Sequence, residues 1–184
     1  MRIKRTSSAV LLSAVILFLL TPLYIDRLVK FYESITRVDH HKQVQKYYDN
    51  PDVPVPEKFL LAVSEGDIKR VAEFIEKGAD VSARDESGGS ALHTAAMRGY
   101  LDIVKYLVAR GVNVNARDGF ERTPLMLAAQ YGKPEVISFL IDKGADVNAK
   151  DVYGHTALSC ARETGEDKTA AYLVKKGAAG RNVK

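Results

Sequence analysis

Residues 118–149 read DGFERTPLMLAAQYGKPEVISFLIDKGADVNA, and this stretch decides how most of the chain folds. It contains Thr-Pro-Leu at 123–125, two alanines at 128–129 and a closing Gly-Ala-Asp-Val-Asn-Ala at 144–149. The same residue types return at intervals of 33, in the series Gly66, Gly99, Gly132 and Gly165; Gly78, Gly111, Gly144 and Gly177; and Ala62, Ala95, Ala128 and Ala161. Three such series at one period indicate a repeat array.

Each unit is predicted to be a helix, a tight turn, a second helix and an extended loop. Thr123 before Pro124 is a helix start, because the hydroxyl accepts from a free amide and proline at the first helical position has no amide to leave unpaired. Gly132 ends this helix, since glycine tolerates the left-handed conformation of a C-terminal cap. A second apolar stretch at 136–141 forms the next helix and ends at Gly144.

One such helix pair cannot bury its apolar face alone, so the pairs must stack. We expect four units, at about 57–84, 85–117, 118–150 and 151–179. The fourth has Ala170 where inner units have Val104 and Ile137, and its helices are rich in charged residues: Arg162, Glu163, Glu166, Asp167, Lys168, Lys175 and Lys176. A polar outer face of this kind is typical of a terminal, capping repeat.

These motifs resemble the ankyrin repeat, whose pattern reads roughly D-x-x-G-x-T-P-L-H-x-A-A-x-x-G, an apolar helix and G-A-D-V-N-A. The second unit matches it with Asp85, Gly88, Ser90-Ala91-Leu92-His93, Ala95-Ala96 and Gly99, and the fourth with Asp151, Gly154, Thr156-Ala157-Leu158, Ala161 and Gly165. The resemblance covers about two thirds of the chain and implies an all-α solenoid. Two departures stand out: the third unit has Glu121 where the pattern has glycine, so we expect its loop to be built differently, and the first has Pro56 and Glu57 at its turn.

The basic residues are concentrated outside the repeats. Residues 57–179 hold 17 Lys or Arg against 18 Asp or Glu, a balance of −1, whereas the rest of the chain holds 10 against 5, a balance of +5. A neutral repeat surface argues against nucleic-acid binding and favours a role near a membrane.

The first 25 residues predict a membrane anchor. Arg2, Lys4 and Arg5 are followed by 20 residues without a charge, from Thr6 to Ile25. As a helix this stretch would span about 30 Å, the thickness of a bilayer core. A cleaved signal peptide is the competing interpretation. No small-x-small pair follows the apolar run, which favours an uncleaved single-pass anchor. The compact basic cluster at the N-terminus favours repeats outside the cytoplasm, in the periplasm if the source is bacterial.

A short amphipathic helix is expected over residues 26–49. Its apolar stripe, at intervals of three and four residues, consists of Leu28, Phe31, Ile35 and Val38 and is our candidate contact within a membrane complex. His40-His41 lacks a third ligand at suitable spacing, so we predict no metal site there. The alternating prolines of residues 50–56 predict a non-helical, semi-rigid spacer, and residues 180–184 a tail.

The sequence carries no catalytic constellation, and we expect neither enzymatic activity nor a cofactor or small-molecule substrate. The glycines follow the repeat period instead of forming a phosphate loop. His93 occupies the histidine of the repeat turn, where a structural hydrogen bond is expected. Cys160 is the only cysteine, and we interpret it as a small buried apolar residue.

Protein binding is the function that the resemblance implies. Partners of ankyrin repeats usually bind the concave side, through loop tips and exposed positions of each first helix. At the matching positions the chain has Met97, Arg98, Phe120, Arg122, Gln130, Tyr131, Tyr153, His155 and Glu163, together with Glu86, Ser87, Gly89 and Thr164. Exposed aromatics beside arginine are typical of interface hot spots, so Phe120, Tyr131 and Tyr153 would form an aromatic line. For Phe120 and Tyr153, packing between adjacent loops is an equal alternative.

Two other functions fit the same sequence. The protein could be a structural subunit held in a membrane complex by its anchor and the Leu28–Val38 stripe. It could also be an exported inhibitor or immunity-type protein that occludes a toxic or hydrolytic partner. In all three cases the partner is a protein, and its identity is not encoded in the repeats.

Overall fold

The computed structural model describes residues 42–178. The chain divides into a unit that ends at Pro51 and a unit that begins at Asp52. The predicted anchor at 1–25, the stripe Leu28, Phe31, Ile35 and Val38, the pair His40-His41 and the tail at 180–184 lie outside the described residues. Within residues 42–178, no helix is long and apolar enough to cross a bilayer. In the first unit, residues 42–49 are helical.

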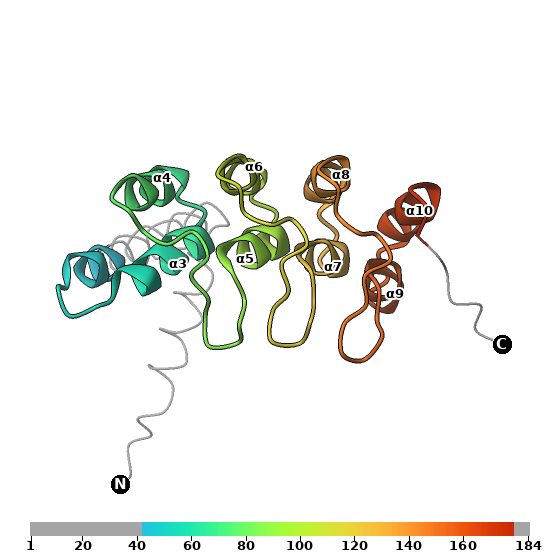
Figure 1. The fold of residues 1–184 in the computed structure, drawn as a ribbon, viewed down its shortest axis with the longest axis horizontal. Coiled ribbons are helices and arrows are strands. Elements are labelled where there is room, and N and C mark those ends of the chain that lie inside the picture. The colour runs from blue at the N-terminus through green and yellow to red at the C-terminus, as the bar shows by residue number, and fades with distance from the viewer. Residues whose placement is uncertain (1–41, 179–184) are drawn as a thin grey trace, which may run out of the picture. The chain divides into compact units, whose positions relative to one another are not determined.

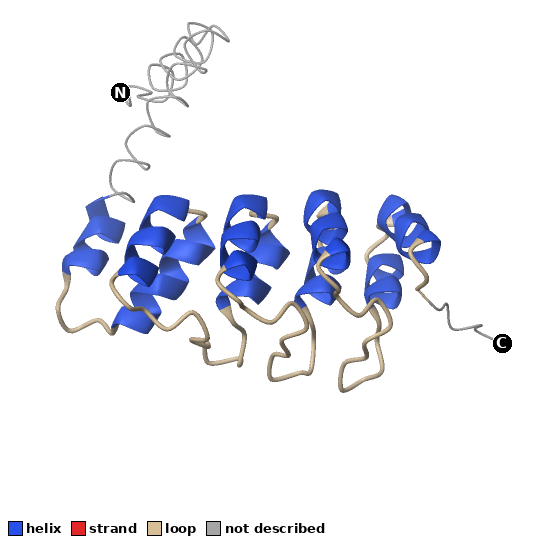
Figure 2. Cartoon of the chain, turned by 45° about the horizontal axis from the view of Figure 1, so that its top comes forward, coloured by secondary structure: helices blue, strands red, loops and turns tan. Residues whose placement is uncertain are grey.

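The second unit is a stack of antiparallel helix pairs (Figure 1). In chain order the helices are α3 (Val55–Glu65), α4 (Ile68–Glu76), α5 (Ala91–Arg98), α6 (Leu101–Ala109), α7 (Pro124–Gln130), α8 (Pro134–Asp142), α9 (Ala157–Glu163) and α10 (Asp167–Lys175). The odd-numbered helices form one row and the even-numbered helices a second row above it (Figure 1). The loops that join successive pairs project to one side of the stack (Figure 2). The predicted all-α solenoid is confirmed for this unit.

Local capping explains where the odd-numbered helices begin. Ser90, Thr123 and Thr156 are the N-cap residues of α5, α7 and α9, and each forms a capping box with the third residue of its helix. In α7, the Thr123 hydroxyl accepts from the amide of Met126 at 3.3 Å. Such caps satisfy amides that have no partner within the helix. The predicted start of the helix at Pro124 is therefore confirmed.

The core lies where neighbouring odd-numbered helices meet. Their paired alanines, Ala95-Ala96 and Ala128-Ala129, are fully buried. Because these side chains are small, the backbones of α5, α7 and α9 approach one another closely, and α5 contacts α7 as α7 contacts α9. The even-numbered helices add the larger apolar groups Ile103, Val104, Leu107, Ile137, Leu140 and Leu173. Of the charged residues expected on the fourth unit, Glu166 is half-buried and the others are exposed.

The predicted spacer is wrong at its end. Residues 50–54 are not helical, but α3 begins at Val55 and includes Pro56 at its start. Proline lacks an amide hydrogen, and the first turn of a helix has no acceptor for one, so Pro56 removes no hydrogen bond at this position. The alternating prolines therefore wrongly predicted a non-helical backbone for Val55 and Pro56, the last two residues of the predicted spacer.

The loop of the third repeat also differs from expectation. Glu121 adopts the left-handed conformation, with φ 61°, that glycine adopts in the neighbouring loops, at Gly88 with φ 75° and Gly154 with φ 80°. Glu121 N–H donates to Asp118 O at 3.0 Å, matching the bond from Gly88 to Asp85 O at 2.9 Å. The turn is thus built in the same way with a residue that is strained there.

His93 joins the second repeat to the third. Its Nδ1 accepts from Ser90 N–H at 3.2 Å, which leaves the ring hydrogen on Nε2, 3.0 Å from the Arg122 carbonyl oxygen. Burial lowers the pKa of His93 below its ordinary value of 6.5, while the Arg122 carbonyl and the Asp118 charge oppose this and Arg84 reinforces it. The predicted structural role of His93 is confirmed.

We predict that Glu121→Gly stabilises the protein by about 0.5 to 1 kcal/mol. Relief of a left-handed residue is worth about 1 to 2 kcal/mol, and the greater freedom of glycine in the unfolded chain offsets part of it. Chemical denaturation measures the difference. The matched control, Gly154→Glu, places glutamate in the same conformation and should cost a similar amount. Equal stability of all three proteins would contradict the strain.

We predict that acid weakens the fold through His93. An unfolded His93 takes up a proton near pH 6.5, whereas the folded side chain resists protonation until lower pH, so its stabilising contribution is complete above pH 6.5 and falls as the pH drops below it. Free energies of unfolding at pH 7.5 and 5.5 should therefore differ less in His93→Gln than in the wild type. His155→Gln, at a half-exposed histidine, is the control. It should keep the part of the pH dependence that His93 contributes to the free energy of unfolding.

Candidate protein-binding surface

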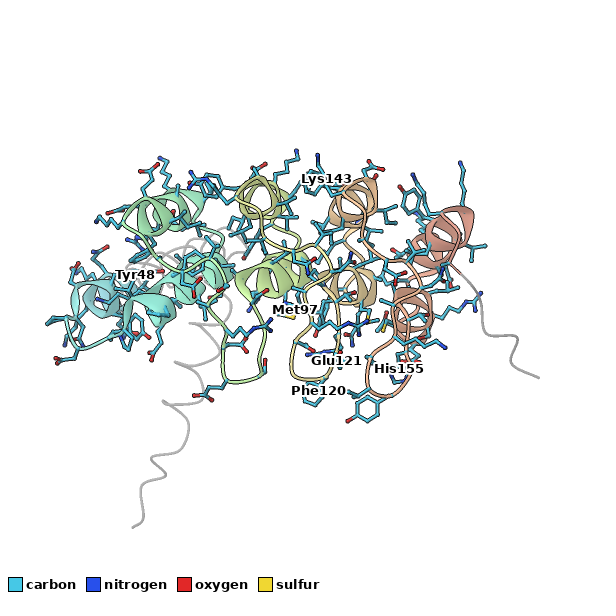
Figure 3. All side chains as sticks on the ribbon, in the orientation of Figure 1. Tyr48, Met97, Phe120, Glu121, Lys143 and His155 are labelled. Carbon is cyan, nitrogen blue, oxygen red and sulfur yellow. The ribbon has the colours of Figure 1, made fainter. Side chains whose placement is uncertain are left out.

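The candidate surface is made by the ends of three connecting loops, residues 85–89, 118–122 and 151–155, which we call the loop tips. Phe120 and Glu121 lie at the end of the loop that precedes α7, and His155 lies nearby at the loop before α9 (Figure 3). Lys143 lies across the stack, at the end of α8 (Figure 3).

In each tip, an aspartate carboxylate accepts hydrogen bonds from two backbone amides of the same tip. Asp118 Oδ1 accepts from the amides of Phe120 and Arg122, both at 2.9 Å. Asp151 does the same for Tyr153 at 2.9 Å and His155 at 2.8 Å, and Asp85 for Ser87 and Gly89 at 2.8 Å. Because every tip has the same internal bonds, side chains at equivalent positions are presented in the same way.

Adjacent tips are joined through their backbones. Gly119 N–H donates to Ser87 O at 2.9 Å, and Val152 N–H donates to Phe120 O at 3.1 Å. The tips therefore form one continuous edge and are not three independent loops.

The most exposed apolar residues of this edge lie on the third and fourth tips. The exposed fractions of Phe120, Val152 and Tyr153 are 45%, 55% and 68%. The guanidinium of Arg122 lies over the Phe120 ring at 5.1 Å, and the rings of Tyr153 and His155 are 5.9 Å apart. Val152 was not among the predicted contact residues.

The basic residues of the two tips are held by the same aspartates. Arg122 pairs with Asp118 at 2.7 Å. Burial works to raise the pKa of Asp118, but hydrogen bonds from Arg122 and neighbouring amides hold it below the ordinary value. In the fourth tip, His155 Nδ1 lies 3.1 Å from Asp151 and its Nε2 3.8 Å from Glu163. Burial and the bonds from His155 oppose each other at Asp151 in the same way, and its pKa is also lowered.

The remaining predicted contacts are spread along the odd-numbered helices. Met97 and Arg98 end α5, Gln130 ends α7, and Tyr131 is the C-cap of α7 with 50% of its surface exposed. Seven residues of helix separate the start of α7 from Tyr131, which corresponds to about 10 Å. No ring contact among the described residues joins Tyr131 to Phe120 or Tyr153. Phe120 and Tyr153 lie on neighbouring tips, whereas Tyr131 lies at the far end of α7, and a shared contact surface for the three rings stays a prediction.

The additional positions differ in accessibility. Glu86, Ser87 and Thr164 are exposed, but Gly89 is buried, and a Cβ atom there would lie 2.8 Å from Asp85 Oδ2. Gly89 therefore offers no side chain to a partner, whereas the equivalent positions of the next two tips hold Arg122 and His155. Cys160 is half-buried and not fully buried as expected. Burial, with Glu163 and Asp151, raises the pKa of its thiol to about 11, which disfavours a reactive thiolate.

Aromatic and basic residues pair along the even-numbered helices, a feature that the sequence reasoning missed. Arg110 lies over Tyr106 at 4.6 Å, Lys143 over Phe139 at 5.6 Å and Lys176 over Tyr172 at 5.5 Å. The members are four residues apart on each helix, and the pairs recur every 33 residues. That period was the signal that could have revealed them. Each cation also lies at a helix C-cap, where the helix dipole favours positive charge.

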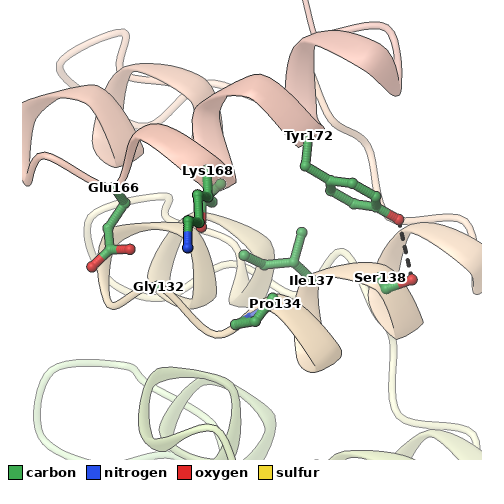
Figure 4. Close-up of a pocket in the computed structure, with 8 residues that line it drawn as sticks. Gly132, Pro134, Ile137, Ser138, Glu166, Lys168 and Tyr172 are labelled. Carbon is green, nitrogen blue, oxygen red and sulfur yellow. Dashed lines mark hydrogen bonds between the residues drawn. The ribbon is translucent and has the colours of Figure 1, made fainter.

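A groove of about 460 Å³ lies between α8 and α10 (Figure 4). Pro134 and Ile137 form one wall, and Thr169 and Tyr172 the other. Tyr172 Oη donates to Ser138 Oγ at 3.1 Å at one end. The residues equivalent to Thr169 in the two preceding repeats are Ile103 and Val136, so the terminal repeat has a less apolar residue where the inner repeats pack closely. Among residues 42–178, no group of three or more His, Cys, Asp or Glu could hold a metal ion.

We predict that Thr169→Ile stabilises the protein by about 1 kcal/mol, because it replaces a hydroxyl with apolar carbon and extends into open space. Thermal and chemical denaturation measure the change. The reciprocal exchange, Ile103→Thr, should cost about 1 to 2 kcal/mol at a site with no such space. Destabilisation by Thr169→Ile would contradict the prediction, because it would mean that the groove has no room for the larger side chain in solution.

Comparison with known proteins identifies the repeats. A family model for ankyrin repeats, in three copies, matches residues 59–151 and 111–183. A putative ankyrin repeat protein of Rickettsia felis is 44% identical over 48 residues, which cover 26% of this chain and 76% of that protein. Serine/threonine-protein kinase 12 of Arabidopsis thaliana is 31% identical over 75 residues, or 41% of this chain and 16% of the kinase.

A human protein, protein phosphatase 1 regulatory subunit 27, is 44% identical over 46 residues, which cover 25% of this chain and 30% of the subunit. The chain thus spans only a minor part of this subunit and of the kinase. The repeats of such proteins are protein–protein interaction modules. Since the family model covers well over half of the chain, the protein belongs to the ankyrin repeat family.

Proposed function

We propose that this protein is a membrane-tethered binding module that recognises a protein partner through the third and fourth loop tips. The observation that carries the proposal is the continuous exposed edge formed by Phe120, Val152 and Tyr153, joined by the bond from Val152 N–H to Phe120 O at 3.1 Å. Exposed aromatics and arginine are enriched among residues that dominate binding energy.

Preorganisation supports this assignment. The aspartate of each tip fixes two amides, and the Arg122 guanidinium is already paired with Asp118 and placed over Phe120. A surface that is rigid before binding loses little conformational entropy on docking. The mechanism is therefore geometric, and we assign the protein no catalytic activity, cofactor or small-molecule substrate.

The tether rests on the sequence of the N-terminal segment. The 20 uncharged residues from Thr6 to Ile25 follow a basic cluster, and the repeat region is nearly neutral. An anchor would raise the effective concentration of the repeats near partners at the same membrane. We place the repeats on the extracytoplasmic side, because the denser basic cluster precedes the apolar segment.

We predict that a photo-crosslinking residue in place of Tyr153 captures a protein partner in native membranes. The same residue in place of Lys143, at the end of α8, should not. Adding Phe120→Ala should lower the yield at position 153 by about tenfold, since loss of one aromatic anchor costs more than about 1 kcal/mol. Cross-linking, immunoblotting and mass spectrometry give the yield and the partner. Equal capture from both positions, or none, would reject binding through the loop tips.

Topology and processing test the tether separately. A C-terminal tag, protease access in sealed vesicles and the mass of the mature chain distinguish an uncleaved anchor from a removed signal peptide. Polar substitution of Leu28, Phe31, Ile35 and Val38 tests the alternative of a structural subunit. Release of the protein from a membrane complex by these changes, with no effect of Phe120→Ala, would favour that alternative.

A further inference from the structure

Two arginines 33 residues apart each span two neighbouring loops. Arg84 Nη1 donates to Gly88 O at 2.6 Å in its own loop and to Arg117 O at 2.7 Å in the next. Arg117 Nη1 donates to Glu121 O at 2.9 Å in its own loop and to Lys150 O at 2.8 Å in the next. Each guanidinium thus links one tip to the residue that immediately precedes the next tip.

These bridges lie beside the backbone bonds that join the tips. The Arg84 bridge accompanies the bond from Gly119 N–H to Ser87 O, and the Arg117 bridge accompanies the bond from Val152 N–H to Phe120 O. Glu121, the residue next to Phe120, is the own-loop acceptor of Arg117. The third and fourth tips are therefore joined by the Arg117 side chain, which does not belong to the exposed edge, as well as by the bond from Val152 N–H to Phe120 O.

A surface ion pair is the simpler explanation for Arg117. Its Nη1 also lies 3.3 Å from Glu121 Oε2, with 40% and 56% of the two side chains exposed. Exposed pairs of this kind contribute little, and the equivalent residue of the second loop is Gly88, which has no carboxylate. Arg84 nevertheless makes the same two carbonyl bonds. The carbonyl bridge, and not the ion pair, is therefore the shared feature.

We infer that Arg117 is a positioning residue that couples the two aromatic tips, so that Phe120 and Tyr153 meet a partner as one preorganised pair. This inference rests on the proposed function for its biological meaning. The coupling itself can be tested without a partner. Loss of the Arg117 bridge should let the bond from Val152 N–H to Phe120 O open more often, while the bond from Gly119 N–H to Ser87 O, between the second and third tips, stays closed. Arg84 has the same role for the second and third tips.

The test is amide hydrogen exchange by NMR on the unbound full-length chain in detergent micelles. In Arg117→Met, exchange of Val152 N–H should rise about tenfold, while Gly119 N–H stays unchanged. Arg84→Met is the matched variant and should produce the reverse pattern. Glu121→Gln, which removes only the ion pair, should change neither amide.

A uniform rise in exchange across the repeats, or an unchanged Val152 amide in Arg117→Met, would overturn the inference. So would full restoration of Val152 protection by Arg117→Lys, because lysine keeps the charge but loses the planar guanidinium. The result is separable from that of the cross-linking experiment. If the two arginine variants give the expected opposite exchange patterns but no partner is captured, the coupling stands and the proposed function is rejected. If a partner is captured but the exchange patterns are not found, the proposed function stands and the coupling is rejected.

Discussion

Contact between neighbouring odd-numbered helices is the constraint on which the rest of the structure depends. A single helix pair leaves one apolar face open to water, and only another pair can cover it. The covering face consists of small side chains, with Ala95, Ala96, Ala128 and Ala129 fully buried. Larger residues there would force the backbones apart and separate the loops that follow. Close stacking therefore sets both the stability of the repeats and the spacing of the loop tips.

Polar contacts then convert that stacking into a defined surface. His93 reaches from α5 to the Arg122 carbonyl oxygen of the next loop, and Arg84 and Arg117 reach to carbonyls 33 residues further along the chain. None of these bonds could form if the helices were displaced by a turn. The tips are consequently rigid through contacts with their neighbours, as well as through their own aspartates. This rigidity is the physical basis of our proposal that the loop edge binds a partner.

Two predictions from the sequence failed, at Pro56 and Glu121, because each residue type was judged without the position it occupies. Pro56 and Glu121 were judged by the usual preference of the residue type, but the first turn of a helix tolerates proline. Within the third loop, Glu121 N–H donates to Asp118 O and Arg117 donates to Glu121 O, so the turn forms although glutamate avoids this conformation. Tyr131 was grouped with Phe120 because both occupy exposed positions of one repeat. The length of α7 separates them, whereas Phe120 and Tyr153 are brought together from different repeats. Local rules describe a residue within its own segment and say little about what a neighbouring repeat imposes.

The sequence by itself determined the stacked architecture and the starts of the helices that follow a Ser or Thr cap, because a period of 33 with capping residues and glycines at constant positions leaves one arrangement of helix pairs. It also singled out Phe120, Arg122, Tyr153 and His155 as surface candidates by position. Only the tertiary structure decided that Phe120, Val152 and Tyr153 lie on one edge, that Gly89 is buried and that Arg117 spans two loops. These facts depend on contacts between residues about 33 positions apart, and such contacts exist only after the repeats have packed against one another.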